Sequence, residues 1–154
     1  MSQTLAAIDM LRAGRYECAV TLAGAAEAML PTSPRALHAI LMTLSVPDEL
    51  SQTSYAELDP KGRNAFWNAE RDWLKHSGPD HPDQWQIHRR DAESMIVRAL
   101  TKVLSAITAI PPSALPALRW FYRSYVEVLG WQPPDGRPID EAIDLLLGLR
   151  PDRA

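Results

Sequence analysis

The sequence is poor in cysteine and has no long apolar run. Its 154 residues include a single cysteine, Cys18, which excludes an internal disulfide and a metal cage built of thiolates. No stretch approaches the roughly 18 consecutive apolar residues of a membrane span. The amino terminus lacks the basic start, apolar segment and cleavage site of a signal peptide. These absences predict a cytoplasmic protein with no membrane partner.

An excess of positive charge is also absent. The chain has 16 Lys and Arg against 19 Asp and Glu, which gives a formal net charge of -3. No global positive field therefore draws it onto nucleic acid, and any polyanion site must be local. The sequence contains no Walker loop, dinucleotide fingerprint, Gly-x-Ser-x-Gly elbow or zinc-protease helix. We therefore expect no cofactor and no bound metal.

What the chain does have is helical periodicity. Apolar residues recur at spacings of three or four, and no pair of alternating runs is joined by a hairpin turn. The pattern predicts an all-α protein. Its expected helices run from the amino terminus to near Gly14 and over residues 16–30, 34–44, 60–76, 92–110, 114–129 and 138–147.

The densest polar chemistry lies on the fourth of these helices. Polar side chains follow one another at helical spacing along one edge, beside a face of Phe66, Ala69 and Trp73. This polar edge consists of Asn64, Asn68, Arg71 or Asp72, and Lys75. Four basic residues against two acidic ones leave +2 over residues 61–76. The local field there favours an anion.

One spacing on this helix is specific. Arg71 is followed directly by Asp72 and, after three further residues, by His76. A chain of this composition is expected to contain about 0.1 such matches by chance. The pattern resembles the motif of the HEPN superfamily, which is Arg, a polar residue, a short spacer and His. The segments RYECAVTLAGAAEAML and DAESMIVRAL also resemble the second helix and a later long helix of a bacterial HEPN-like group.

The resemblance implies an up-and-down helical bundle, with a core at about 3–110 and a helical extension at about 111–154 within one domain. Members of the superfamily are commonly homodimers, and active ones are metal-independent endoribonucleases, often toxins with a cognate antitoxin or a nucleotidyltransferase-like partner. It implies Arg71 and His76 as catalytic residues acting on RNA. The supporting or RNA-binding residues would be Asn64, Asn68, Asp72 and Lys75. Other members bind a nucleotide, RNA or protein partner without cleaving.

Other interpretations of the same residues remain open. Arg71 and Asp72 also fit a solvated helix edge with local ion pairs, and His76 fits a helix end that favours a cation. His76, together with the other His and Asp residues of the loop that follows, also suggests zinc, but the spacing fits no ligand pattern. Trp67 and Trp73 fit a core or an interface better than a base-stacking role.

Two residues of the second helix carry expectations of their own. Glu27 lies in a small, apolar run, so it is either at an exposed edge or buried with a basic partner. Arg98 and Arg71 are the candidates for that partner, in a structural pair. Cys18 is expected to be a small core residue, since nothing basic flanks it. On the helix expected over 114–129, packing is predicted for the apolar face of Leu115, Leu118, Tyr122, Val126 and Leu129. The aromatic residues expected on the exposed side of the segment RWFYRSYVEVLGW are numerous enough to serve as an interface.

Overall fold

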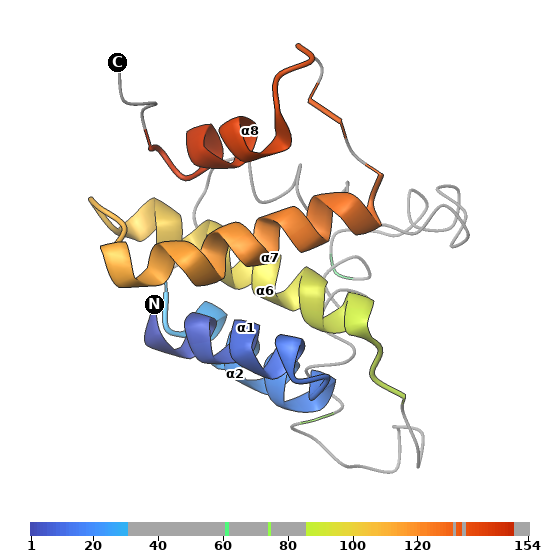
Figure 1. The fold of residues 1–154 in the computed structure, drawn as a ribbon. Helices are drawn as coiled ribbons and strands as arrows, with labels where there is room; N and C mark the ends of the chain where they lie inside the picture. The colour runs from blue at the N-terminus through green and yellow to red at the C-terminus, as the bar shows by residue number, and fades with distance from the viewer. Residues whose placement is uncertain (31–60, 62–73, 75–85, 131, 134, 150–154) are drawn as a thin grey trace. The chain divides into compact units, whose positions relative to one another are not determined.

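The computed structural model describes residues 1–30, 61, 74, 86–130, 132–133 and 135–149, and every regular element within them is helical (Figure 1). The elements are α1 (Ser2–Arg12), α2 (Tyr16–Ala28), α6 (Arg89–Ala106), the 3-10 turn η1 (Pro112–Ala114), α7 (Leu115–Val128) and α8 (Ile139–Leu146). The all-α class is confirmed. No helix in this part of the chain is long and apolar enough to cross a membrane.

Two of the expected helices fall largely outside these residues. The helix expected over 34–44 lies wholly outside the described part of the chain. Within the helix expected over 60–76, only Lys61 and Leu74 are described, and both are helical. The remaining five expected helices are all observed.

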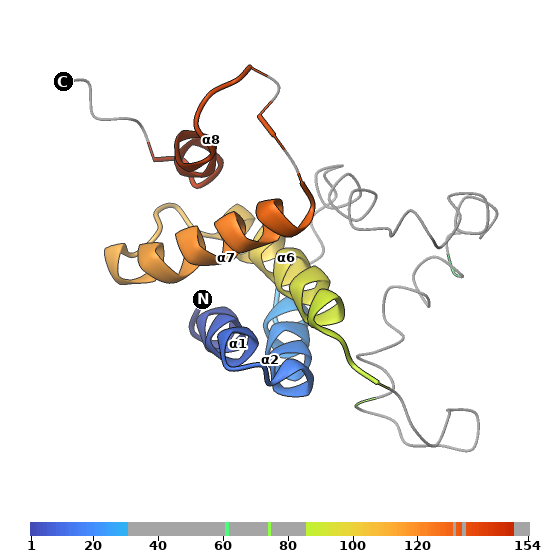
Figure 2. The same cartoon turned by 45° about the vertical axis from the view of Figure 1, so that its right-hand side comes forward.

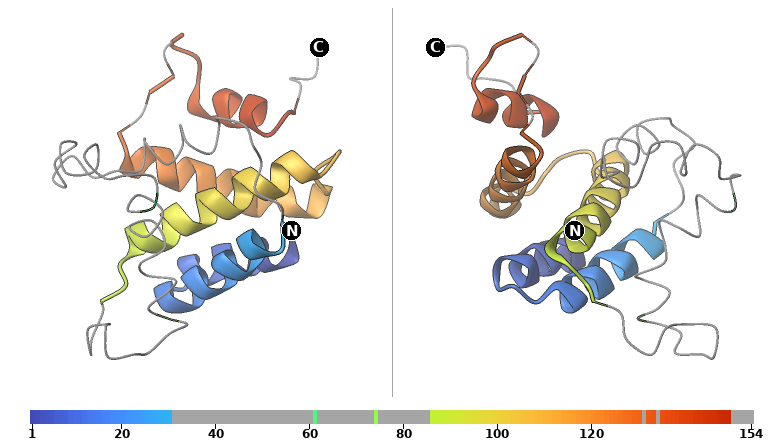
Figure 3. Two further views of the ribbon diagram at one scale, coloured as in Figure 1. Left: turned by 180° about the vertical axis from the view of Figure 1, so that it is seen from behind. Right: turned by 90° about the vertical axis from the view of Figure 1, so that its right-hand side faces the viewer.

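The chain divides into two compact units, Met1–Ala106 and Ile107–Ala154. In the first unit, α1, α2 and α6 pack against one another in all three pairs. Figures 2 and 3 show α1 and α2 lying side by side, with α6 against them. The buried apolar residues that these helices contribute include Ala7, Ile8, Leu11, Ala19, Val20, Ala23, Ala26, Ala92, Ile96, Ala99, Leu100 and Val103.

The turn between α1 and α2 is formed by a glycine at the predicted position. Gly14 has φ 71°. In this conformation a residue with a Cβ atom would be strained, whereas glycine is not. Its N–H donates to the carbonyl of Leu11 at 3.1 Å, and the N–H of Arg15 donates to that of Met10 at 2.9 Å. These two bonds satisfy carbonyls that the end of a helix leaves without partners. The chain then reverses into α2.

Small residues let α2 approach both of its neighbours. Ala19 and Ala23 are fully buried, and Gly24 and Ala26 are buried with them. Without bulky side chains at these positions, a neighbouring helix backbone can come close.

Cys18 is exposed, so its prediction as a core residue was wrong. The buried positions of α2 are Ala19, Val20, Ala23, Gly24, Ala26 and Glu27. Cys18 lies with Glu17 and Thr21 on the exposed side of the helix. Position on the helical wheel decides exposure here, because a helix buries one face regardless of the polarity of a single residue on the other.

α6 is the most extensively buried helix of the first unit. Every residue from Met95 to Thr101 is buried. It ends at Ala106 and not at Ile110 as expected. The residues after it include β-branched Ile107, Thr108 and Ile110, and Ile110 precedes a proline, which disfavours the α conformation. The proline pair therefore ends the helix earlier than the apolar spacing alone suggests.

The second unit is built on α7, against which η1 and α8 pack. Its buried residues on α7 are Leu118, Phe121, Tyr122 and Tyr125. The face predicted from Leu115, Leu118, Tyr122, Val126 and Leu129 was therefore only partly right. Phe121 stacks on Tyr125 with ring centres 5.9 Å apart and meets Tyr122 edge-on at 5.5 Å. The large rings, which bury more area than Val126 or Leu129, take the inner face.

Burial of Tyr122 predicts an alkaline limit to stability. Desolvation raises the pKa of its hydroxyl well above the ordinary value, and neighbouring Tyr125 adds to the shift. In the unfolded chain this hydroxyl ionises near pH ~10, so above that pH the folded state binds more protons than the unfolded state. Stability should then fall as the pH rises. The free energy of unfolding of Tyr122→Phe, measured with urea at pH 9 to 11, values set around the ~10 reference, should fall less with rising pH than that of the native chain. Equal falls would contradict the assignment.

Candidate functional site

The residues predicted to carry chemistry lie outside the part of the chain that the structure describes. This holds for the proposed catalytic pair, Arg71 and His76. It holds equally for the supporting residues Asn64, Asn68, Asp72 and Lys75. Their roles stay predictions, and so do the homodimer, RNA, antitoxin and nucleotidyltransferase-like partners. Three features of the described residues are considered below: a buried charge cluster and a pocket in the first unit, and a hollow in the second.

The first feature is a buried charge cluster between α2 and α6. The Glu27 carboxylate accepts a hydrogen bond from Arg98 Nη2 at 2.9 Å. Lys102 Nζ lies 3.5 Å from the same oxygen and donates to the backbone carbonyl of Glu27 at 3.3 Å. The three side chains are only 5%, 7% and 10% exposed for Glu27, Arg98 and Lys102. The expected buried pair of Glu27 with Arg98 is confirmed.

This cluster joins α2 to α6 and supplies a hydrogen-bond donor to a carbonyl in the last turn of α2. Glu27 is in the last turn of α2, where carbonyl groups have no partner within the helix and carry partial negative charge. Lys102 supplies both a donor and a positive charge there. Sequence reasoning missed Lys102, although its position one turn after Arg98 was a usable signal. Among the described residues, the cluster thus holds two cations and one carboxylate.

A second buried carboxylate on α6 was also missed. Glu93 is 2% exposed at its side chain, and Arg89 Nε donates to it at 2.7 Å. At the start of the same helix, the Asp91 carboxylate accepts a hydrogen bond from the backbone N–H of His88 at 2.7 Å. The four-residue spacing of Arg89 and Glu93 was the available signal, because such pairs meet on a helix surface.

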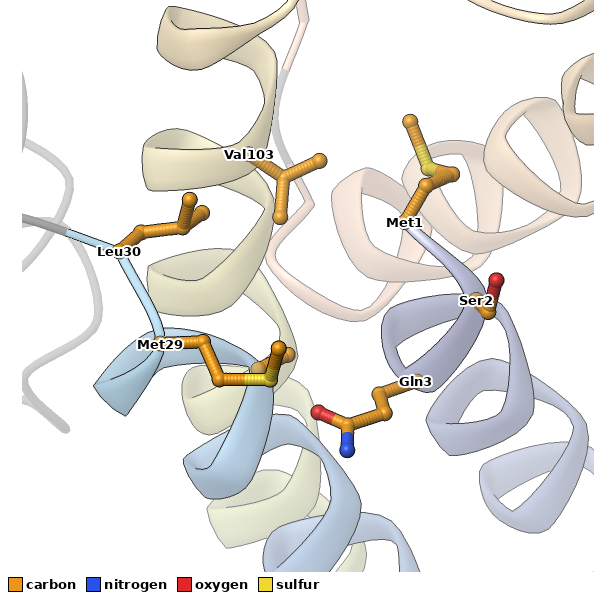
Figure 4. A pocket seen from close by; sticks show the side chains of 7 residues that line it. Met1, Ser2, Gln3, Met29, Leu30 and Val103 are labelled. Atoms are coloured by element: carbon orange, nitrogen blue, oxygen red, sulfur yellow. The ribbon is translucent and has the colours of Figure 1, made fainter.

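The second feature is an apolar pocket of about 260 Å³ in the first unit. It lies where the start of α1, the end of α2 and α6 meet, and Figure 4 shows Met29 and Gln3 extending toward each other across it. Leu30 and Val103 line the side formed by α2 and α6. Met29 is 74% exposed. The described residues of the lining are mainly apolar, and none of them has an ionisable side chain.

The third feature is a hollow of about 550 Å³ in the second unit, lined by Arg119, Trp120, Arg123, Asp140 and Asp144. Arg119 donates to both oxygens of Asp144, at 2.7 and 3.0 Å. Arg123 donates to Asp140 through Nε at 3.1 Å and through Nη2. The hydrogen bond to Asp144 raises the pKa of the Arg119 guanidinium. Because Arg119 pairs with the later aspartate and Arg123 with the earlier one, α7 and α8 run antiparallel.

Among the described residues, no three His, Cys, Asp or Glu side chains are close enough to hold a metal ion. His88, at the start of α6, is exposed. The other residues considered for zinc, including His76, lie outside the described ranges.

Comparison with protein-family models, with curated proteins and with solved structures finds no match for this chain.

Proposed function

We propose that this protein is a HEPN-like, metal-independent endoribonuclease whose catalytic residues are Arg71 and His76. The observation that carries this function is the Arg71-Asp72 pair followed by His76, a specific spacing in one basic segment of an otherwise acidic chain.

Helix packing on either side of that motif supports the same function. The segments RYECAVTLAGAAEAML and DAESMIVRAL flank the motif in sequence, and they contain the whole of α2 and residues 91–100 of α6. These two helices pack together and are joined by the ion pair of Glu27 with Arg98. A helical scaffold of this kind is what the HEPN resemblance implies for the segments around the motif.

The proposed residues suit cleavage of RNA without a metal. The reaction needs a group that takes a proton from the 2′-hydroxyl or gives one to the leaving oxygen, and histidine titrates near neutral pH. Negative charge gathers on the phosphoryl oxygens in the transition state. A permanently charged, planar guanidinium such as that of Arg71 can bind two of these oxygens at once. Asp72 would orient one of the two side chains, and Asn68, three residues before Arg71 in the sequence, would donate to phosphate or ribose.

A noncatalytic HEPN-like module that holds a nucleotide, RNA or protein partner is the second candidate. The formal charge of -3 weighs against general RNA binding, because nonspecific RNA affinity comes mainly from neutralised phosphates, and it favours a nucleotide or protein as the partner of such a module. If RNA is the partner, it would bind without being cut, and the affinity would fall steeply with salt.

A cleavage assay in excess chelator separates the two candidates. Native protein should cut a defined RNA under these conditions, and Arg71→Ala should cut it about 10²- to 10³-fold more slowly, the usual cost of losing one transition-state donor. Arg63→Ala, another basic residue of the same segment, is the matched control and should retain most activity. Cleavage that needs a divalent ion, or that survives Arg71→Ala, would remove the ribonuclease function.

A further inference from the structure

Two arginines of α7 share one exposed face. Arg119 and Arg123 are four residues apart, so their side chains leave the helix on the same side, about 6 Å apart along its axis. Their side chains are 51% and 53% exposed. Two like charges at this spacing destabilise an isolated helix. The arrangement therefore calls for an anionic partner.

In the structure that partner is a pair of carboxylates on α8. Each guanidinium presents its Nε and Nη2 donors to one aspartate, Asp144 for Arg119 and Asp140 for Arg123. This edge of the guanidinium, with two parallel donors, is the one that also binds two oxygens of a phosphoryl group. The carboxylates thus occupy the donors that a phosphate would use.

Apolar side chains help to anchor α8 beside the aspartates. Ile143 and Leu147, at 3% and 5% exposure, bury the inner side of this segment. Asp140 is 66% exposed, and an ion pair exposed to this degree adds little to stability, because solvent and salt screen it. The four charged side chains line the hollow of about 550 Å³ described above, together with Trp120. A hollow of this size leaves room for a ligand beside the ion pairs.

We propose that Arg119 and Arg123 form a binding site for a polyanion with adjacent phosphoryl groups, and that Asp140 and Asp144 occupy the site as internal competitors. Each guanidinium takes two non-bridging oxygens of one phosphoryl group when the ligand displaces the carboxylates. The ligand chemistry fits both a free polyphosphate and the backbone of single-stranded RNA. The site stands apart from the proposed ribonuclease activity, since it uses residues of the second unit and is measured by binding.

The test is calorimetric titration of the full chain with inorganic tripolyphosphate and, in a second arm, with a single-stranded RNA oligonucleotide. The double variant Asp140→Asn with Asp144→Asn keeps the shape of both side chains and removes their charge. This variant should bind at least one of the two ligands about tenfold more tightly than the native chain does. A gain of this size is what one strengthened charge-assisted hydrogen bond contributes to affinity. Adding Arg119→Gln and Arg123→Gln to this variant should abolish the gain.

The matched control is Asp135→Asn. Asp135 also pairs with one arginine, Arg137, on the exposed surface of the second unit, so its replacement changes the net charge without touching Arg119 or Arg123. A gain confined to tripolyphosphate would identify a free polyphosphate ligand, and a gain with the oligonucleotide would identify the RNA backbone. Two results would overturn the proposal. In the first, the gain in affinity of the double variant for both ligands, divided by the number of charges removed, is no larger than that of Asp135→Asn. In the second, the gain persists when the two arginines are replaced.

Discussion

His76→Ala should reduce RNA cleavage by about 10²- to 10⁴-fold, the range that a positioned acid or base contributes. The imidazole is the one group of the motif that can exchange a proton near neutral pH, because Arg71 stays protonated. The residual rate should no longer depend on pH between about 5 and 8, the interval in which a histidine ordinarily titrates. RNA affinity, measured separately by titration, should change little.

Mixing subunits tests whether the second histidine comes from a partner. One imidazole cannot conveniently serve as both base and acid in a single step, so we expect two motifs to meet across a two-fold axis. When native protein is mixed and re-equilibrated with excess His76→Ala protein, activity should fall as the square of the native fraction. A strictly linear fall would mean that each subunit cleaves alone. Full activity of His76→Ala by itself would exclude this histidine from catalysis.

Glu27→Leu should lower the free energy of unfolding by about 3–5 kcal/mol, as is typical when one member of a buried ion pair is removed. The substitution leaves Arg98 and Lys102 with little exposure and without their shared carboxylate. Leucine fills a similar volume with an apolar side chain, so the lost free energy of unfolding reflects the missing charge and not a cavity. Urea denaturation followed by circular dichroism measures the change.

A double variant shows whether the loss comes from the cluster itself. Arg98→Met combined with Glu27→Leu should be more stable than Glu27→Leu alone, because the second change removes the more deeply buried of the two cations that have lost the Glu27 carboxylate. Glu17→Leu, at an exposed position of the same helix, should have little effect. Equal losses at Glu17 and Glu27 would contradict a special role for the buried pair.

Local pattern was enough to predict the helices and several of their ends. The spacing of apolar residues predicted all five described helices, and Gly14 and Gly130, with φ 71° and 62°, follow α1 and α7 where expected. These features depend on residues within one or two turns of each other, which the sequence shows directly. The candidate catalytic pair also came from local spacing, and its geometry stays a prediction.

Features that depend on contacts between helices were predicted less completely. The exposure of Cys18 and the burial of Phe121 and Tyr125 on α7 were missed, because a stripe of apolar residues gives a face only approximately. The pairing of Arg119 with Asp144 was missed as well, since no short spacing links two residues 25 positions apart.

The sequence by itself determined that Glu27 needs a basic partner if it is buried, since a carboxylate cannot be buried alone in an apolar stripe. Only the tertiary structure decided that it is buried and that Arg98 and Lys102 surround it, Arg98 from 71 positions away along the chain. The physical reason is that the need of a buried carboxylate for a partner follows from its chemistry alone, whereas its burial and the choice among possible cations depend on which helix packs against α2.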